Sequence, residues 1–222
     1  LHLDQGHALL QANVAHPDPA QREADRRRLE LHVRLAHELG VRTIVVHPGM
    51  TPRATTRGER QTEIRYNVDA FRALGESAGS LGCRLAIENM PRHGFCSAAD
   101  LLELLDAIGS PAVGIAFDSS HAHMTRALDL PAAVSDSGSR LFATHLSDND
   151  GSGDQHRTPG NGTIEWAPLM RALDAAAYDG LVNLEIPGER HAVLELRALR
   201  SRHAFAVAGW LMGLAGTTPA AR

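Results

Sequence analysis

The chain has 222 residues, a length that suits one sizeable domain with its own hydrophobic core. All 22 basic residues are arginine, and the 26 acidic residues leave a formal net charge of −4. This balance gives no general attraction for nucleic acid, and the lack of lysine excludes Schiff-base chemistry within this sequence. No segment approaches the roughly 20 apolar residues of a membrane span, so we expect neither nucleic acid nor a membrane as partner. No signal-peptide pattern is visible, and a cytoplasmic protein is expected.

Short apolar runs alternate with helix-like segments along the whole chain. We expect strands at residues 1–7, 43–47, 85–88, 113–118, 141–145 and 181–185. Amphipathic helices are expected between them, one starting at Asp18-Pro19 and ending at Gly40. A long helix follows the last strand. We expect a single domain over residues 1–216, with residues 217–222 as a flexible tail.

Apolar strands separated by amphipathic helices predict a parallel sheet covered by helices. A (β/α)8 TIM barrel has eight such units in about 250 residues, so six units predict an α/β TIM barrel without its first two βα units. The chain starts with Leu1 and no Met, and we therefore expect the natural N-terminus to lie upstream. A doubly wound open sheet is the alternative, but it usually gathers its ligands at one crevice instead of at every strand end.

Acidic and imidazole side chains stand where the predicted strands end. These side chains belong to His47, Glu88, Asp118, His145 and Glu185. The carboxyl ends of barrel strands meet at one rim, so we expect these groups to lie together. Without His47, the set has three carboxylates and one imidazole, a donor set that suits Mn²⁺, Zn²⁺, Mg²⁺ or Co²⁺. A divalent cation would relieve the repulsion among these carboxylates.

Further side chains could hold a second or a third metal ion. His7 ends the first strand, His121 follows Asp118 by three residues, and Asp154 and His156 form a D-x-H pair. Each histidine taken alone could instead be a hydrogen-bonded residue at the rim.

The loop 147–163, which carries the D-x-H pair, is rich in Asp and Gly. Asp148 and Asp150 are interpreted as turn residues of this loop. Trp166, just after the loop, is interpreted either as a core residue or as a wall of the substrate pocket.

Several segments resemble those of the xylose-isomerase-like TIM barrel superfamily, which contains sugar isomerases, sugar epimerases and AP endonucleases of the endonuclease IV type. The segments are VVHPG (45–49), AIENMP (86–91), GIAFDSSHAHM (114–124), THLSDNDGSGDQHRTPGNGTIEW (144–166) and NLEIPG (183–188). The resemblance covers nearly the whole chain. It implies a shared metal ion on Glu88, Asp118, His145 and Glu185. In the endonuclease IV branch it implies further zinc ions at positions matching His7 and His47, and at positions matching His121, Asp154 and His156.

The resemblance favours a divalent-metal-dependent isomerase or epimerase that acts on a sugar or sugar phosphate through an enediolate. Glu88 and Glu185 would then exchange protons with the substrate, and His121 would bind a substrate oxygen. A homo-oligomer is left open, because barrels of this type often pair.

The alternative is a multi-zinc phosphodiesterase that acts on abasic DNA, which the full set of nine ligand positions favours. The net negative charge, the lack of lysine and the Asp-rich loop oppose this alternative. A metal-stabilised binding protein is a third class, but structural zinc sites are usually closed and rich in cysteine.

Overall fold

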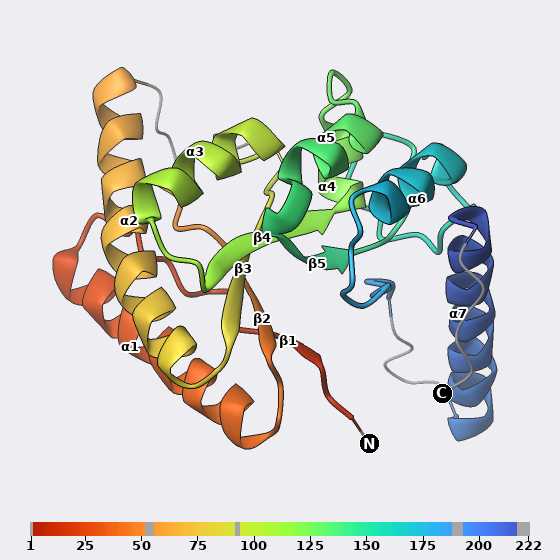
Figure 1. Ribbon diagram of the computed structural model, residues 1–222, viewed down its shortest axis with the longest axis horizontal. Helices are drawn as coiled ribbons and strands as arrows, with labels where there is room; N and C mark the ends of the chain where they lie inside the picture. Colours follow the sequence, from red (N-terminus) through yellow and green to blue (C-terminus); the bar gives the residue numbers. More distant parts are fainter. Residues whose placement is uncertain (1, 52–55, 92–93, 188–192, 217–222) are drawn as a thin grey trace.

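The computed structural model describes residues 2–51, 56–91, 94–187 and 193–216. One sheet contains five parallel strands in chain order, which are β1 (Gln5–His7), β2 (Thr43–Val46), β3 (Arg84–Glu88), β4 (Val113–Asp118) and β5 (Leu141–His145). The helices are α1 (Pro19–Glu38), α2 (Arg57–Ser80), α3 (Ala98–Ile108), α4 (Ser119–Met124), α5 (Leu130–Ser137), α6 (Trp166–Ala175) and α7 (Leu194–Leu214). Figure 1 shows the helices around the outside of the curved sheet, with α7 at the margin beside α6. The predicted TIM barrel is therefore confirmed in partial form.

The two faces of the sheet bury side chains of different size. On the outer face, Ile44, Leu85 and Ile115 belong to the large core shared with the helices. The opposite face carries a small cluster of fully buried residues, namely Val45, Ala86, Ala116 and Ala143. This alternation follows from the two-residue period of a strand. Small inner side chains let the strands curl together. The side-chain amide of Gln5 on β1 donates a hydrogen bond to the Thr144 carbonyl on β5 (3.4 Å), so the first and last strands of the sheet are linked directly.

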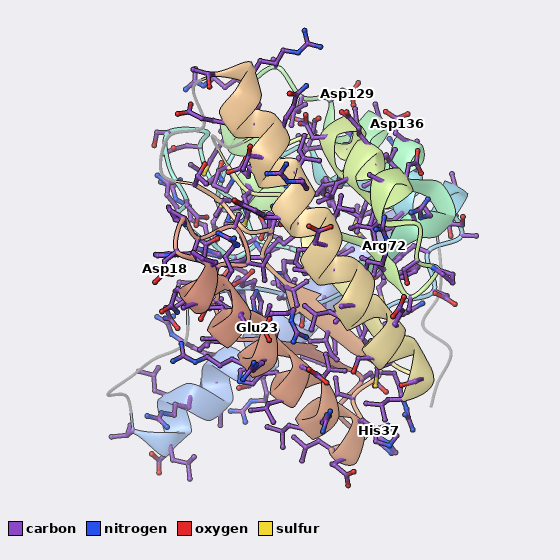
Figure 2. All side chains as sticks on the ribbon, turned by 90° about the vertical axis from the view of Figure 1, so that its left-hand side faces the viewer. Asp18, Glu23, His37, Arg72, Asp129 and Asp136 are labelled. Atoms are coloured by element: carbon purple, nitrogen blue, oxygen red, sulfur yellow. The ribbon has the colours of Figure 1, made fainter. Side chains whose placement is uncertain are left out.

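The outer helices begin at the capping residues that the sequence indicates. Asp18 caps α1 by accepting a hydrogen bond from the Ala20 amide, and Pro19 occupies the first helical turn. Figure 2 shows α1 and α2 side by side, with Asp18 and His37 at the two ends of α1. Arg72 of α2 donates hydrogen bonds to carbonyls at the end of α3, which joins these helices around the sheet.

The strand predicted at residues 181–185 is wrong as a full strand, because only one bridge pairs Leu184 with Leu146. The Leu146 amide donates to the Asn183 carbonyl (2.8 Å), and the Glu185 amide donates to the Leu146 carbonyl (3.1 Å). Within the described ranges no further strand pairs with the other side of this segment. Pro187, two residues after Glu185, has no amide hydrogen with which to extend the pairing. The bridge still fixes the position of Glu185.

The C-terminal helix α7 contacts the rest of the fold through few residues. Leu211 is its one buried residue, and Leu194 and Phe205 are 78% and 83% exposed. No helix in the described ranges has the length and apolar character needed to cross a membrane. The predicted tail, residues 217–222, lies outside the described residues.

Candidate metal centre

The parallel register of the sheet brings the ends of neighbouring strands together. Asp118 at the end of β4 pairs with His145 at the end of β5, and Glu88 at the end of β3 pairs with Ala116. The bridge at Leu184 adds Glu185 to this edge. One ligand atom from each of Glu88, Asp118, His145 and Glu185 lies within 4.8 Å of the others. The structure therefore gathers the four predicted ligands of the shared metal ion.

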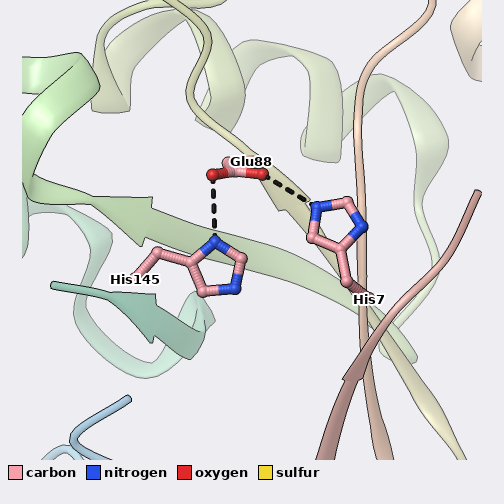
Figure 3. A group of neighbouring side chains, drawn as sticks. All are labelled: His7, Glu88 and His145. Atoms are coloured by element: carbon pink, nitrogen blue, oxygen red, sulfur yellow. Dashed lines mark hydrogen bonds and ion pairs between the residues drawn. The ribbon is translucent and has the colours of Figure 1, made fainter. Parts of the chain in front are cut away.

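Glu88 lies between His7 and His145 (Figure 3), and its side chain is 2% exposed. Its Oε2 atom contacts Nε2 of His7 at 3.3 Å and Nε2 of His47 at 3.1 Å. Its Oε1 atom lies 3.0 Å from Nδ1 of His145. Burial alone would raise the pKa of Glu88, but the hydrogen bonds from His145, His47 and His7 hold the pKa well below its usual value. Glu88 is therefore a charged carboxylate in a ring of imidazoles.

His145 stands between two carboxylates that compete for the same ring nitrogen. Its Nδ1 atom hydrogen-bonds to Glu88 and also lies 2.8 Å from Oε2 of Glu185. Burial would lower the pKa of His145, but the contacts with Glu185 and Glu88 raise it to about 10. The contact with His145 in turn lowers the pKa of Glu185. One proton cannot satisfy both carboxylates, whereas a cation shared by the three groups can.

Asp118 is fully buried at the start of α4. Its Oδ1 atom accepts a hydrogen bond from the His121 amide (2.7 Å), and its backbone exchanges two hydrogen bonds with the Asn89 side chain. Burial raises the pKa of Asp118 to about 7, although the charge of His121 acts in the opposite direction. Asn89 was not singled out as a site residue, yet it fixes the backbone that carries Asp118.

A second group of ligands lies beside the first, formed by His121, Asp154 and His156. Oδ2 of Asp154 lies 3.4 Å from Nε2 of His121 and 3.1 Å from Nε2 of His156. The hydrogen bond with Asp154 raises the pKa of His156 to about 9. Burial would lower the pKa of His121, but Asp154 and the charge of Asp118 raise it to about 9. Hydrogen bonds from His121 and His156 lower the pKa of Asp154.

The loop that carries Asp154 and His156 is anchored by Asp148. Asp148 is fully buried, and its carboxylate accepts hydrogen bonds from the Trp166 indole (2.9 Å) and from three backbone amides, those of Asn149, Gly160 and Ile164. Its backbone pairs in both directions with that of Arg157. The interpretation of Asp148 as a turn residue is therefore wrong, and Trp166 is a core residue. The sequence holds one signal for this role of Asp148: Trp166 lies close to it along the chain, and the N–H of a buried indole needs an acceptor.

Asp150 does form the predicted turn, since its carboxylate accepts a hydrogen bond from the Ser152 amide (3.0 Å). It also pairs with Arg157 (3.0 Å). His156 has a backbone φ of 46°, a left-handed value that is uncommon for a residue with a side chain. The pairing of its neighbour Arg157 with Asp148 holds the loop in this conformation.

The chemistry of the first group fits a divalent cation. Among the described residues, Oδ2 of Asp118 is a buried carboxylate oxygen without a hydrogen-bond partner, and the buried Oε2 of Glu185 has only its 2.8 Å contact with Nδ1 of His145, which already hydrogen-bonds to Glu88. Buried polar atoms are rarely left in this state, and a cation would satisfy both. Oxygen and imidazole donors without a thiolate are typical ligands of Mn²⁺, Zn²⁺, Mg²⁺ and Co²⁺.

The fold and the candidate ligands at its strand ends agree with a known class of protein. The sequence profile of the xylose isomerase-like TIM barrel family matches residues 2–204, and the chain belongs to this family. An uncharacterized protein of Methanocaldococcus jannaschii is 28% identical over 169 residues, 74% of this chain and 57% of that protein. The D-psicose 3-epimerase of Enterocloster bolteae is 27% identical over 135 residues, 59% of this chain and 42% of the enzyme. The chain spans between 57% and 61% of the length of the first curated relatives.

Solved structures share the same fold. The crystal structure of a D-tagatose 3-epimerase-like protein superimposes with a TM-score of 0.79 at 22% sequence identity. The superposition covers 96% of this chain and 79% of that protein. At this level of identity the likeness establishes the fold, which is that of a TIM barrel.

Proposed function

We propose that this chain carries the active site of a divalent-metal-dependent sugar isomerase or epimerase. The observation that carries the proposal is the meeting of Glu88, Asp118, His145 and Glu185 within 4.8 Å at the carboxyl edge of the sheet. The resemblance to proteins named D-psicose 3-epimerase and inosose isomerase supports it. A cation held by these four side chains would act as a Lewis acid and stabilise the negative charge that develops when a proton leaves the substrate.

Glu185 is the carboxylate best placed to take the proton from the carbon beside the substrate carbonyl. Its side chain is 40% exposed, whereas that of Glu88 is 2% exposed. The contact with His145 lowers the pKa of Glu185, so that it is charged, as a general base must be. In an isomerisation, one accessible carboxylate can take the proton from one carbon and return it to the neighbouring carbon. Epimerisation at one carbon requires a second group on the opposite face, which is the role we propose for Glu88.

His121 is proposed to orient a substrate oxygen. Its Nδ1 atom hydrogen-bonds to the Asn89 carbonyl (2.9 Å), which leaves Nε2 on the side of Asp154. The ring is therefore fixed between the two ligand groups, where it can serve either a substrate or a second cation.

The test is hydrogen exchange at the substrate carbon. We expect the metal-loaded protein to exchange a C–H of a ketose with D₂O, and Glu185→Gln to slow this exchange at least about a hundredfold. The control is Glu103→Gln on the exposed face of α3, which should exchange at the wild-type rate. Exchange at the wild-type rate by Glu185→Gln would contradict the role of Glu185 as the base.

The second candidate function is hydrolysis of a phosphodiester in abasic DNA. The second ligand group and the contacts of His7 and His47 with Glu88 favour it, because they offer places for additional cations. The net charge of −4 opposes it. Cleavage of an abasic duplex, without proton exchange on any member of a panel of ketoses and aldoses, would favour the hydrolase.

A further inference from the structure

The segment that carries Glu185 is held less firmly than the strands that carry the other ligands of its group. Those three ligands end strands of the sheet, whereas one bridge, Leu184 with Leu146, joins this segment to the end of β5. The Glu185 side chain is 40% exposed, so packing does not fix it either. Contacts outside the sheet are therefore needed to hold the proposed base in place.

Hydrogen bonds reach this segment at its start and at Glu185. At its start, the Leu181 carbonyl accepts hydrogen bonds from the hydroxyl groups of Thr144 (2.8 Å) and Tyr178 (3.0 Å). At Glu185, the backbone amide donates to a carbonyl at the end of β5 (3.1 Å), and the backbone carbonyl accepts from Nδ1 of His156 (3.0 Å). His156 therefore binds the backbone of Glu185 itself.

The loop conformation places His156 firmly. Its backbone φ of 46° is uncommon for a residue with a side chain, and such conformations persist where the surrounding structure fixes them. The next residue, Arg157, exchanges two backbone hydrogen bonds with the buried Asp148 (2.7 and 2.8 Å), so the loop is anchored beside His156. The ring of His156 therefore extends from an anchored loop to the less firmly held segment of Glu185.

The two nitrogens of the His156 ring face different partners. Nε2 lies 3.1 Å from Oδ2 of Asp154, within the second ligand group. Nδ1 faces the Glu185 carbonyl, and because a carbonyl oxygen can only accept, Nδ1 carries the hydrogen in this contact. The Ser147 hydroxyl is farther from Nδ1, at 3.5 Å. Holding Glu185 and serving as a ligand are therefore roles of different atoms.

We propose that His156 is a positioning residue for Glu185, because its Nδ1–H holds the backbone that carries the proposed base. The inference rests on the proposed function and deepens it. Proton transfer requires the base to lie at a set distance from the substrate carbon, and small displacements slow such steps strongly. The loop 147–163 would support proton transfer through this contact, whatever Nε2 binds.

Three substitutions of His156 separate the two roles. The side-chain nitrogen of asparagine lies as many bonds from Cβ as Nδ1 does, and asparagine tolerates left-handed backbone, so His156→Asn keeps the donor to Glu185 and loses Nε2. The side-chain nitrogen of glutamine lies as many bonds from Cβ as Nε2 does, so His156→Gln loses the donor at Nδ1. His156→Ala loses both nitrogens.

The first test is amide hydrogen exchange of residues 182–186 in the Mn²⁺-loaded protein without substrate, measured by mass spectrometry. Loss of one hydrogen bond predicts about tenfold faster exchange in His156→Ala and His156→Gln, and a rate within about twofold of the wild type in His156→Asn. The control is His123→Ala, which removes a histidine that contacts Thr163 of the same loop (2.8 Å) and belongs to neither ligand group. It should exchange as the wild type does. Wild-type exchange in His156→Ala, or equally fast exchange in His123→Ala, would overturn the proposal.

The second test is turnover of a panel of ketoses and aldoses by the same proteins. The value of kcat should fall about tenfold in His156→Ala and His156→Gln and stay within about twofold of the wild type in His156→Asn. KM should change little, since the four ligands of the first group are intact. Turnover by His156→Asn as slow as that by His156→Ala would overturn the inference and leave the proposed function standing. Failure of the wild type to turn over any sugar, together with the expected exchange pattern, would overturn the proposed function and leave the hold on Glu185 standing.

Discussion

Glu88, Asp118 and His145 project from the ends of strands, whereas Asp154 and His156 project from a loop of the same centre. The strand-end side chains are at most 5% exposed, and the loop side chains are 27% to 35% exposed. The ladder of the parallel sheet fixes the first set directly. The loop set depends on the hydrogen bonds that the Asp148 carboxylate accepts, mostly from backbone amides.

This difference indicates how firmly each part of the centre is held. A ligand on a central strand moves only if the sheet moves, so the strand-end group is preorganised for a cation. A ligand on a loop can be displaced by changes in its anchor alone. We therefore expect variants of the strand-end group to have large effects, and variants of the loop group to have graded ones.

The largest effect is expected for Glu88→Gln. The neutral amide cannot balance the charge of His145, whose pKa the carboxylates raise to about 10, so the metal-free protein should lose about 3–5 kcal/mol of unfolding free energy. Urea unfolding and metal analysis test this expectation, and the strand-end cation should be lost. Turnover should fall at least about a thousandfold.

The matched control for this variant is again Glu103→Gln, whose side chain lies on the exposed face of α3. It should change the unfolding free energy by less than about 0.5 kcal/mol and keep the full metal content. A stable Glu88→Gln variant with wild-type metal content would show that Glu88 is not a ligand.

An intermediate effect is expected for Asp148→Asn. The Trp166 indole and the Gly160 amide share Oδ2 as acceptor, and the Asn149 and Ile164 amides share Oδ1. The NH2 group of an asparagine would replace one of these oxygens and leave one pair of donors without an acceptor, which costs about 1–3 kcal/mol for each buried group. Urea unfolding measures this loss, and limited proteolysis within residues 148–164 reports the opening of the loop. Asp150→Asn, in the same loop but exposed to solvent, should cost much less than Asp148→Asn. Equal losses in the two variants would contradict the anchoring role of Asp148.

The smallest effect is expected for His156→Ala. It removes a candidate ligand of the loop group, while the strand-end group stays complete. Sugar turnover should fall by about tenfold, and the strand-end cation should remain in metal analysis. A phosphodiesterase that uses both groups would instead lose nearly all of its activity, so assays on a ketose and on an abasic duplex separate the two functions.

Much of the candidate site could be predicted from the positions at which apolar runs end. Glu88, Asp118 and His145 come together because parallel strands place their carboxyl ends at one edge, whatever the helices between them contain. The caps at Asp18 and Ser97 could be predicted for a similar reason, since a cap depends on a few neighbouring residues. Such local rules do not reveal how long a strand pairing extends, and residues 181–185 form only a bridge.

The sequence by itself determined the alternation of strands and helices and the meeting of acidic and imidazole side chains at the strand ends, because both depend on backbone periodicity and chain direction. The tertiary structure alone decided that Asp148 is buried and anchors the loop, and that Arg157 and Arg200 face one cavity. These residues are distant in sequence or lie in irregular backbone. In such backbone no regular period relates the position of a residue in the sequence to the direction of its side chain. Their contacts arise only when the loop after β5 and α7 settle against the finished sheet.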